Sequence, residues 1–274
     1  MQSIRVLALA TCYNRCEQTY RSLESLIKGN PHIKFSFIIV DDGSADGTKS
    51  MLESFDNVTI VEGSGSLFYS GGMRLAIAKA KTVEDRYDFC MLFNDDVDFY
   101  PHAIEKMVAL TNIERRVIVG ATCDSNGKLT YAGVNKLSKW IPKCEIVYSN
   151  KERLTTCDTF NANCVIIEHN VFLTLDNIDP VYIHGMGDYD YGFSATRKGI
   201  KLYVSNFFCG VCGETTEEGS WRDSSLTRKE RLAIKNHAKG TPDKVWFHYL
   251  LKNYNILTAI VYSISPYVRI LLGK

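Results

Sequence analysis

The sequence predicts an α/β fold, with a mixed but mainly parallel central sheet flanked by helices and a C-terminal helical tail. Two observations indicate this class. Short apolar runs alternate with segments of helical spacing along the first part of the chain. Three of those apolar runs also end in polar clusters. The chain has 274 residues, 45% of them hydrophobic, which suits one large domain or two closely packed halves.

The elements follow one another in a regular order. An apolar run at 4–10 predicts the first strand, and the helix after it is ended by the Gly-Asn-Pro sequence at 29–31. The later elements expected in this part of the chain are a strand at 33–40, a helix ending near Phe55, a strand at 58–61, a strand at 89–93 and a helix starting near Pro101. This alternation is typical of a mainly parallel sheet.

The strand at 89–93 is followed at once by Asn94, Asp95, Asp96 and Asp98. Carboxylates so close together repel one another and resist burial without compensation. A hard divalent cation would supply that compensation through oxygen ligands. An acidic turn that caps the next helix is the alternative, and this stretch alone does not decide between the two.

Polar clusters also follow the strands at 4–10 and 33–40, at positions 11–15 and 41–44. Ligands of parallel sheets bind just beyond the carboxyl ends of the strands, so the coincidence of three clusters indicates a binding site. The dinucleotide fingerprint and the P-loop are both missing. If the protein binds a nucleotide, neither of these two common phosphate-binding loops therefore holds it.

The overall charge and the N-terminal sequence limit the partners and the location that we expect for this protein. A net charge of +1 gives no basic field for nucleic acid, so we expect no nucleic-acid partner. Residues 1–10 lack a charged start followed by a long apolar core, so we expect no signal peptide and a cytoplasmic protein.

Three stretches together resemble family 2 glycosyltransferases. They are Val-Leu-Ala-Leu-Ala-Thr-Cys-Tyr-Asn-Arg, Ile-Ile-Val-Asp-Asp-Gly-Ser-Ala-Asp-Gly-Thr and Leu-Phe-Asn-Asp-Asp-Val-Asp-Phe-Tyr-Pro. The resemblance covers roughly 4–210 and implies an inverting enzyme of the GT-A fold, similar to bacterial enzymes of surface polysaccharide assembly. It implies a GT-A domain at 1–240, with a nucleotide-sugar half at 1–100 and an acceptor half at 101–240, followed by a tail at 241–274.

The resemblance also assigns the donor site. Asp96 would be the direct ligand of Mn²⁺ or Mg²⁺, and Asp95 would lie nearer the ribose or the sugar. Tyr13 would pack near the base, and Asp42 would accept a hydrogen bond from a pyrimidine ring N–H, so that UDP or dTDP is the expected nucleotide. The residues assigned to the nucleotide sugar are Thr11, Tyr13, Arg15, Asp42, Gly71, Gly72, Arg74 and Asp95.

The acceptor half would supply the catalytic base. Asp188 is the first choice and Asp190 the second, because a carboxylate near a helix N-terminus can take the proton of an attacking hydroxyl. Both could instead merely cap that helix. Asn161, Asn163 and His184 are the predicted contacts to sugar or acceptor, with turn and structural roles as the alternatives. Many relatives have a metal-binding histidine after the next strand, whereas the corresponding region of this chain, 205–214, has none. Cys212 lies near that place, so the metal's coordination shell would be incomplete, filled by water or differently arranged.

The segment 245–272 is apolar and aromatic, and basic residues flank it. It suits a helix at a membrane interface, on the inner face of the membrane, or packing against the domain or a second subunit in a homo-oligomer. We therefore expect transfer of a sugar from a nucleotide diphosphate to a saccharide or lipid-linked saccharide. A sugar nucleotidyltransferase and a non-catalytic nucleotide-sugar-binding protein are the alternatives.

Overall fold

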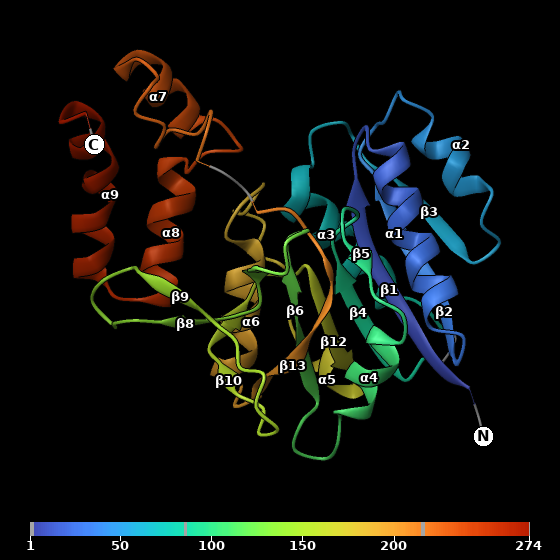
Figure 1. The fold of residues 1–274 in the computed structure, drawn as a ribbon. Coiled ribbons are helices and arrows are strands. Elements are labelled where there is room, and N and C mark those ends of the chain that lie inside the picture. Colours follow the sequence, from blue (N-terminus) through green and yellow to red (C-terminus); the bar gives the residue numbers. More distant parts are fainter. Residues whose placement is uncertain (1–2, 85–86, 215–216, 274) are drawn as a thin grey trace.

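The computed structural model describes residues 3–84, 87–214 and 217–273. Helices cover both faces of a central sheet, and three further helices stand to one side of it (Figure 1). The strands are β1 (Ile4–Cys12), β2 (Ile33–Asp41), β3 (Val58–Glu62), β4 (Phe89–Phe93), β5 (Asp98–Phe99), β6 (Val117–Cys123), β7 (Leu129–Tyr131), β8 (Gly133–Lys136), β9 (Cys144–Val147), β10 (Thr156–Cys157), β11 (Thr159–Phe160), β12 (Cys164–Glu168) and β13 (Leu202–Val211). The helices are α1 (Cys16–Gly29), α2 (Thr48–Glu53), α3 (Phe68–Ala80), α4 (Ala103–Ala109), α5 (His169–Thr174), α6 (Gly187–Arg197), α7 (Arg228–Asn236), α8 (Asp243–Asn253) and α9 (Ile256–Leu271).

The main sheet has the strand order β10-β13-β6-β12-β4-β1-β2-β3. Strands β3, β2, β1 and β4 are parallel, β6 and β13 are parallel, and β12 runs antiparallel between β4 and β6. The start of β12 therefore lies at the same edge as the ends of β1, β2, β4 and β13. This topology brings Asn163 and Cys212 to the edge where the acidic run follows β4.

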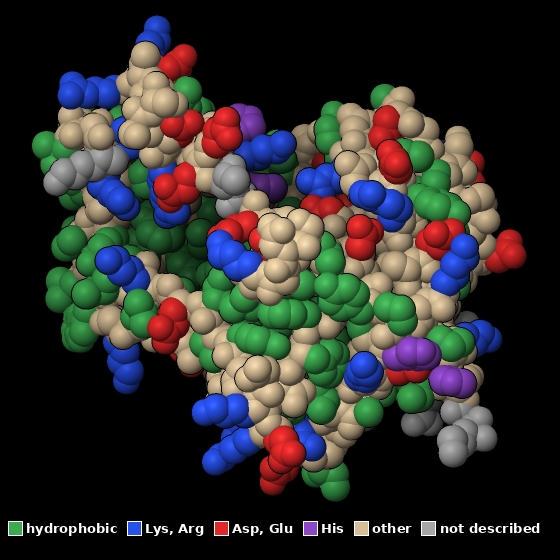
Figure 2. All heavy atoms as spheres, viewed as in Figure 1, with side chains coloured by type: hydrophobic (Ala, Val, Ile, Leu, Met, Phe, Trp, Pro, Cys, Tyr) green, Lys and Arg blue, Asp and Glu red, His purple; other side chains and the backbone are tan. Residues whose placement is uncertain are grey.

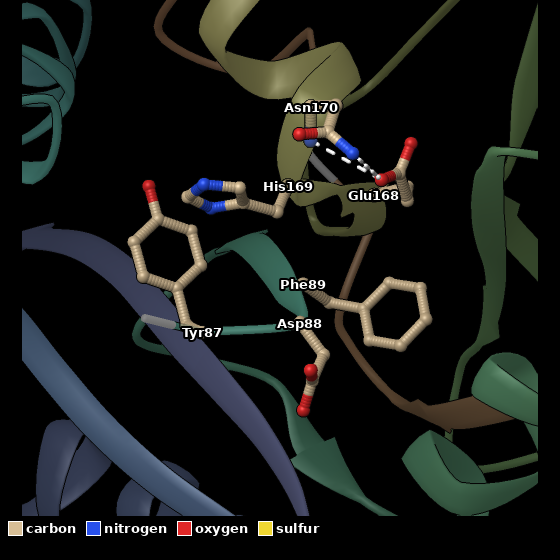
Figure 3. Close-up of a pocket in the computed structure, with 6 residues that line it drawn as sticks. All are labelled: Tyr87, Asp88, Phe89, Glu168, His169 and Asn170. Carbon is tan, nitrogen blue, oxygen red and sulfur yellow. Dashed lines mark hydrogen bonds between the residues drawn. The ribbon is translucent and has the colours of Figure 1, made fainter. Parts of the chain in front are cut away.

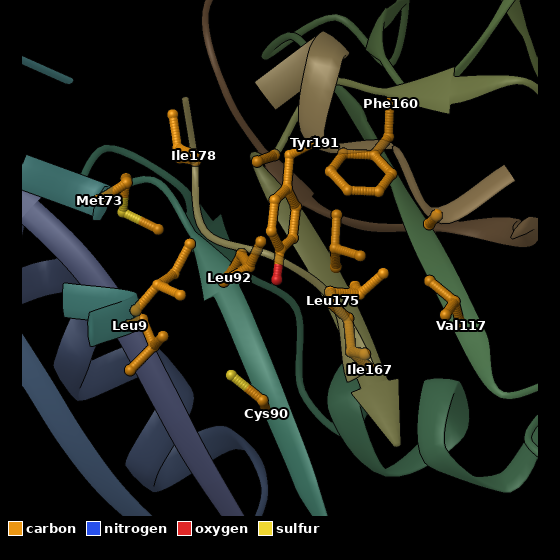
Figure 4. Packing of buried hydrophobic residues seen from close by; sticks show 14 of the residues in the cluster. Leu9, Met73, Cys90, Leu92, Val117, Phe160, Ile167, Leu175, Ile178 and Tyr191 are labelled. Carbon is orange, nitrogen blue, oxygen red and sulfur yellow. The ribbon is translucent and has the colours of Figure 1, made fainter. Parts of the chain in front are cut away.

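Alternate residues of the strands face two separate cores. Leu7 and Leu9 of β1 face the core beneath α3, α5, α6 and α8, part of which is drawn in Figure 4. Val6 and Ala8 face the core beneath α1, α2 and α4. The sheet is thus buried on both faces, as its continuous apolar runs predict.

The predicted mixed, mainly parallel sheet with flanking helices is confirmed. The strand expected at 89–93 has these bounds, and α1 ends at Gly29 as predicted. The segment 156–167 contains three short strands, β10, β11 and β12, separated by a bend at Asp158 and a turn at 161–163.

The tail is helical as predicted, but 245–272 forms two helices because the chain turns at Tyr254 and Asn255. The Asn255 side chain accepts the N–H of Thr258 at 2.9 Å and so caps α9. Helices α8 and α9 pack side by side, and α7 packs on α9. In the described ranges, no helix combines the length and the apolar character needed to cross a membrane.

Helix α3 packs closely on the end of β1 through a glycine. A Cβ atom on Gly72 would lie 2.2 Å from Oγ1 of Thr11, well inside van der Waals contact. We predict that Gly72→Ala lowers the free energy of unfolding by about 1–3 kcal/mol, because the added methyl group overpacks this contact. Urea denaturation measures the loss.

Gly213→Ala is the matched control, since a Cβ atom there would meet no heavy atom within 4 Å. Its unfolding free energy should change by less than about 0.5 kcal/mol. Equal stability of the two variants would contradict the close packing of α3 on β1.

Candidate active site

Arg15 bridges two carboxylates of the acidic run. Its Nη1 lies 3.1 Å from Oδ1 of Asp95 and 2.8 Å from Oδ2 of Asp96. Asp95 is buried and also accepts the hydroxyl of Thr19 at 3.2 Å. Burial raises the pKa of Asp95 to about 6, even though Arg15 acts in the opposite direction. Asp96 keeps 36% of its side chain exposed, so it is the more accessible of the two carboxylates.

Cys212 lies beside this pair. Its Sγ is 3.7 Å from Oδ1 of Asp96 and accepts Nδ2 of Asn163 at 3.3 Å. Burial, and then the charge of Asp96, raise the pKa of the thiol to about 12. Cys212 is therefore a neutral thiol in contact with Asp96.

The side chains beside Asp96 could hold a divalent metal in one arrangement. Across the described residues, no group of three His, Cys, Asp or Glu side chains could hold a metal. Asp96 offers one accessible carboxylate, and Mg²⁺ is often bound by one or two carboxylates together with substrate phosphates. A neutral thiol is a poor ligand for such an ion. The site thus fits a metal that shares its shell with a bound diphosphate.

The Asp42 carboxylate holds the start of α3. It accepts the backbone N–H groups of Gly65, Leu67 and Phe68 at 2.8, 2.8 and 3.0 Å. Nearby, the Thr11 hydroxyl donates to the carbonyl of Val40 at 3.1 Å. These hydrogen bonds compensate a buried carboxylate and fix the loop between β3 and α3.

The other residues predicted to bind the nucleotide sugar have different surroundings from Asp42 and Thr11. Tyr13 is exposed in the turn after β1, where its ring is free to contact a ligand. Gly71 and Gly72 are buried near the start of α3. Arg74 donates from its Nη1 to the carbonyl of Tyr182 at 3.1 Å.

Asp188 lies in the first turn of α6. Its carboxylate accepts a hydrogen bond from the backbone N–H of Tyr189 at 2.9 Å. It also accepts one from the backbone N–H of Ala162. Burial raises the pKa of Asp188 to about 6. Tyr69 lies near both carboxylate groups, since burial and then the charges of Asp188, Asp96 and Asp95 raise its pKa well above the usual value. The structure thus brings Asp188 and the acidic run to one place.

Asp190 faces the tail instead. Its side chain is buried and pairs with Nζ of Lys252 at 2.8 Å and Nη2 of Arg197 at 3.5 Å. It also accepts Nδ2 of Asn253 at 3.0 Å. These partners occupy the carboxylate and join α6 to α8.

The predicted acceptor residues lie around Asp188. Asn161 hydrogen-bonds the side chain of Tyr189, and Asn163 is buried between Cys212 and Asn94. Nδ1 of His184 is buried and has no hydrogen-bond partner. The ring of His184 lies 6.1 Å from that of Phe68, centroid to centroid.

Neither Tyr69 nor His237 was predicted from the sequence as a site residue. The ring of His237 also lies 6.1 Å from that of Phe68, on which it packs edge-on. Phe68 and Met186 have φ angles of 53° and 69°, which are unusual for side chains of this size. Such strain often marks functional sites, but the sequence carried no local signal of it.

The surface is hollowed between the tail helices and the sheet domain, and histidine and charged side chains gather at the upper rim of this hollow (Figure 2). A separate cavity of about 380 Å³ lies at the opposite edge of the sheet (Figure 3). It is lined by Tyr87, Asp88 and Phe89 at the start of β4, and by Glu168, His169 and Asn170. It therefore contains none of the predicted site residues.

The sequence profile of Glycosyl transferase family 2 matches residues 8–172, which is more than half of the chain. The chain belongs to this family. As a family 2 glycosyltransferase, it transfers a sugar from a nucleotide-sugar donor. No curated protein matches it in sequence.

Solved structures share the GT-A-like fold of this family 2 protein. The mannosyltransferase PcManGT from Pyrobaculum calidifontis, in complex with GDP-Man and Mn²⁺, is 13% identical, with a TM-score of 0.53 over 98% of this chain and 73% of that one. TarS 1-349 of S. aureus is 11% identical, with a TM-score of 0.53 over 97% and 80%. GalNAc-T7 with UDP, GalNAc and Mn²⁺ is 14% identical, with a TM-score of 0.57 over 96% and 57%.

The partners of Asp190 give it a structural role that can be tested. We predict that Asp190→Ala lowers the free energy of unfolding by about 2 kcal/mol, because Lys252, Arg197 and Asn253 lose a buried partner. Chemical denaturation measures this loss. Asp176→Ala is the control, because that side chain is 80% exposed, and its change should stay below about 0.5 kcal/mol. Unchanged stability of Asp190→Ala would contradict the structural role.

Proposed function

We propose that this chain is an inverting glycosyltransferase that acts on a hydroxyl group of a saccharide or lipid-linked saccharide, in surface polysaccharide biosynthesis. The observation that carries the proposal is the common position of Asp188 and the acidic run, with Tyr69 near both. A donor bound at the acidic run would present its sugar towards Asp188. A hydroxyl activated there would attack the anomeric carbon from the side opposite to the leaving nucleotide.

The nucleoside would lie by Thr11, Tyr13 and Asp42. The Asp42 carboxylate accepts three backbone N–H groups, and a carboxylate has about four acceptor positions, so one remains for the N–H of a pyrimidine base. The exposed ring of Tyr13 suits stacking on that base. UDP or dTDP is accordingly the proposed nucleotide. TarS has been crystallised with UDP-GlcNAc, although PcManGT carries GDP-Man.

Asp96 would hold a divalent metal, Mn²⁺ or Mg²⁺, together with the donor diphosphate. When bound, the metal would neutralise charge on the leaving diphosphate. Two of the structural neighbours were solved with Mn²⁺. Arg15, which bridges Asp95 and Asp96, would keep both carboxylates oriented and would lie close to the diphosphate.

Asp188 is the proposed general base. Its raised pKa of about 6 makes the carboxylate a better proton acceptor than an ordinary aspartate, while it stays ionised at neutral pH. The N–H groups of Ala162 and Tyr189 hold its orientation. Asn161, Asn163 and His184 surround this position and would contact the sugar or the acceptor.

The tail supports a lipid-linked acceptor. One face of α9 is apolar and exposed, and the loop before β9 lies against its start, where Thr258 Oγ1 donates to the carbonyl of Trp140 at 3.0 Å. Trp140 and Leu257 are each 62% exposed. The other exposed apolar side chains of this surface are Leu137, Ile141, Ile256, Ile260, Val261, Ile264, Val268 and Leu271.

The two segments that carry this surface contain basic but no acidic residues. Lys139 and Lys143 lie in the loop and Arg269 on α9, and neither 137–143 nor 244–273 contains Asp or Glu. A twofold contact with a second copy would bring these like charges together. An anionic lipid surface would attract them and would also bury the apolar side chains. We therefore assign this surface to peripheral contact with an anionic membrane.

The proposed function predicts donor turnover. The protein should release nucleoside diphosphate from one member of a panel of UDP-, dTDP- and GDP-sugars, in the presence of Mn²⁺. Asp188→Asn should reduce this rate by about 100-fold or more, because the base is lost, while calorimetric affinity for the nucleoside diphosphate stays within about twofold. Asp176→Asn is the matched control and should keep full activity.

The pH profile of the same reaction follows from the raised pKa. Because Asp188 acts in its ionised form, kcat/KM should level off above pH 7 and fall about tenfold per unit below pH 6. Full turnover by Asp188→Asn would exclude it as the base. Tight donor binding with no turnover, even with saccharide acceptors added, would instead favour a non-catalytic binder.

The membrane assignment predicts selective binding to vesicles. The protein should sediment with vesicles that contain phosphatidylglycerol but not with pure phosphatidylcholine. Replacing Trp140 and Leu257 together by serine should weaken this binding by about fivefold or more, since both side chains would lose apolar contact with lipid. Leu173→Ser, at an exposed leucine of α5, is the control. A dimer in sedimentation velocity that the double variant abolishes would overturn the assignment.

A further inference from the structure

Basic side chains from three distant segments lie close to one another. Arg15 follows β1, His184 precedes α6, and His237 and Lys239 form the turn between α7 and α8. The Phe68 ring links two of them, because it lies 6.1 Å from the rings of both His184 and His237. The tail therefore reaches the edge of the sheet that carries the predicted donor site.

These groups lie close enough to influence one another. Burial, and then the charges of Lys239, Arg15 and His237, lower the pKa of His184. Arg15 is balanced by Asp95 and Asp96. Lys239 takes part in none of the ion pairs found within the described ranges, and its side chain is exposed. The charge of Lys239 is therefore not compensated by any ion pair in the described ranges, and a bound anion would compensate it.

The turn that carries His237 and Lys239 is held firmly. The side chain of Lys235 is fully buried, and its ammonium group pairs with Asp243 of α8 and donates to the hydroxyl of Tyr267 of α9 at 3.1 Å. Gly240 is required next to it, because a Cβ atom there would lie 2.1 Å from the carbonyl oxygen of Ile234. The turn is thus positioned before any ligand binds, which lowers the entropy cost of binding.

The same turn adjoins the predicted nucleotide site. The backbone N–H of Phe68 donates to the Asp42 carboxylate at 3.0 Å, while its ring touches His237. A nucleotide with its base near Asp42 and its phosphates near Asp96 would pass Phe68, and its diphosphate would come between Arg15 and Lys239. A phosphate group there would compensate the charge of Lys239.

We propose that His237 and Lys239 bind the diphosphate of the donor and of the leaving nucleoside diphosphate, so that the tail forms one wall of the donor site. The inference rests on the proposed function, since it concerns the same donor. It adds residues that lie outside the stretch matched by the family profile, 8–172. The tail would then take part in donor binding as well as in membrane contact.

Calorimetric titration with nucleotides tests the inference. Lys239→Ala should weaken binding of the nucleoside diphosphate that the unsubstituted protein prefers by about tenfold, as expected for the loss of one charge-assisted contact. Binding of the matching nucleoside should change by less than about twofold. His237→Ala should act in the same direction, and Lys239→Arg should restore most of the affinity. Lys229→Ala, at an exposed lysine of α7, is the control and should bind like the unsubstituted protein.

The outcomes separate the inference from the proposed function. If the unsubstituted protein binds no nucleoside diphosphate, the proposed function fails and the inference fails with it. If it binds one and Lys239→Ala binds it equally well, the inference alone is overturned. An equal loss of diphosphate and nucleoside binding would also overturn it, since the effect would then not act through the phosphates.

Discussion

The buried carboxylate of Asp190 determines how the two parts of the molecule meet. Its contacts with Lys252 and Asn253 join α6 to α8, and Arg197 binds both Asp190 and Asn253. A buried carboxylate is costly unless it is paired in this way, so the tail cannot separate from α6 without a large loss. Because α6 also carries Asp188 in its first turn, one junction positions both the proposed base and the tail.

The sequence was sufficient to predict the sheet and the edge at which the polar clusters meet. The strand at 89–93 and the end of α1 follow from local features, namely a doubly buried apolar run and a Gly-Asn-Pro stop. Three polar clusters after strands indicated a single edge, and the topology brings them there. Cys212 likewise lies beside Asp96, near where the missing histidine was expected.

The remainder of the site depends on contacts between residues far apart in the chain. Whether Asp42 faces solvent or the N–H groups of α3 is decided by a loop more than twenty residues later. The two aspartates at 188 and 190 look alike in sequence, yet one accepts the N–H groups of Tyr189 and Ala162 and the other pairs with Lys252. His237 gave no signal, because its position depends on how α7 packs against α8 and α9. Periodicity reports local structure only, so it cannot reveal such pairings.

The distance in sequence between Asp190 and Lys252 also has a consequence for biosynthesis. Strands β1 to β4 and the helices between them are contiguous, so the nucleotide half of the sheet can form while the chain is still being made. Within α6, Arg197 can already pair with Asp190, but the contacts of this carboxylate with Lys252 and Asn253 form only once α8 has been made. A nascent chain would thus form the ends of β1, β2 and β4 well before α8 holds Asp190, and with it the helix that carries Asp188, in place.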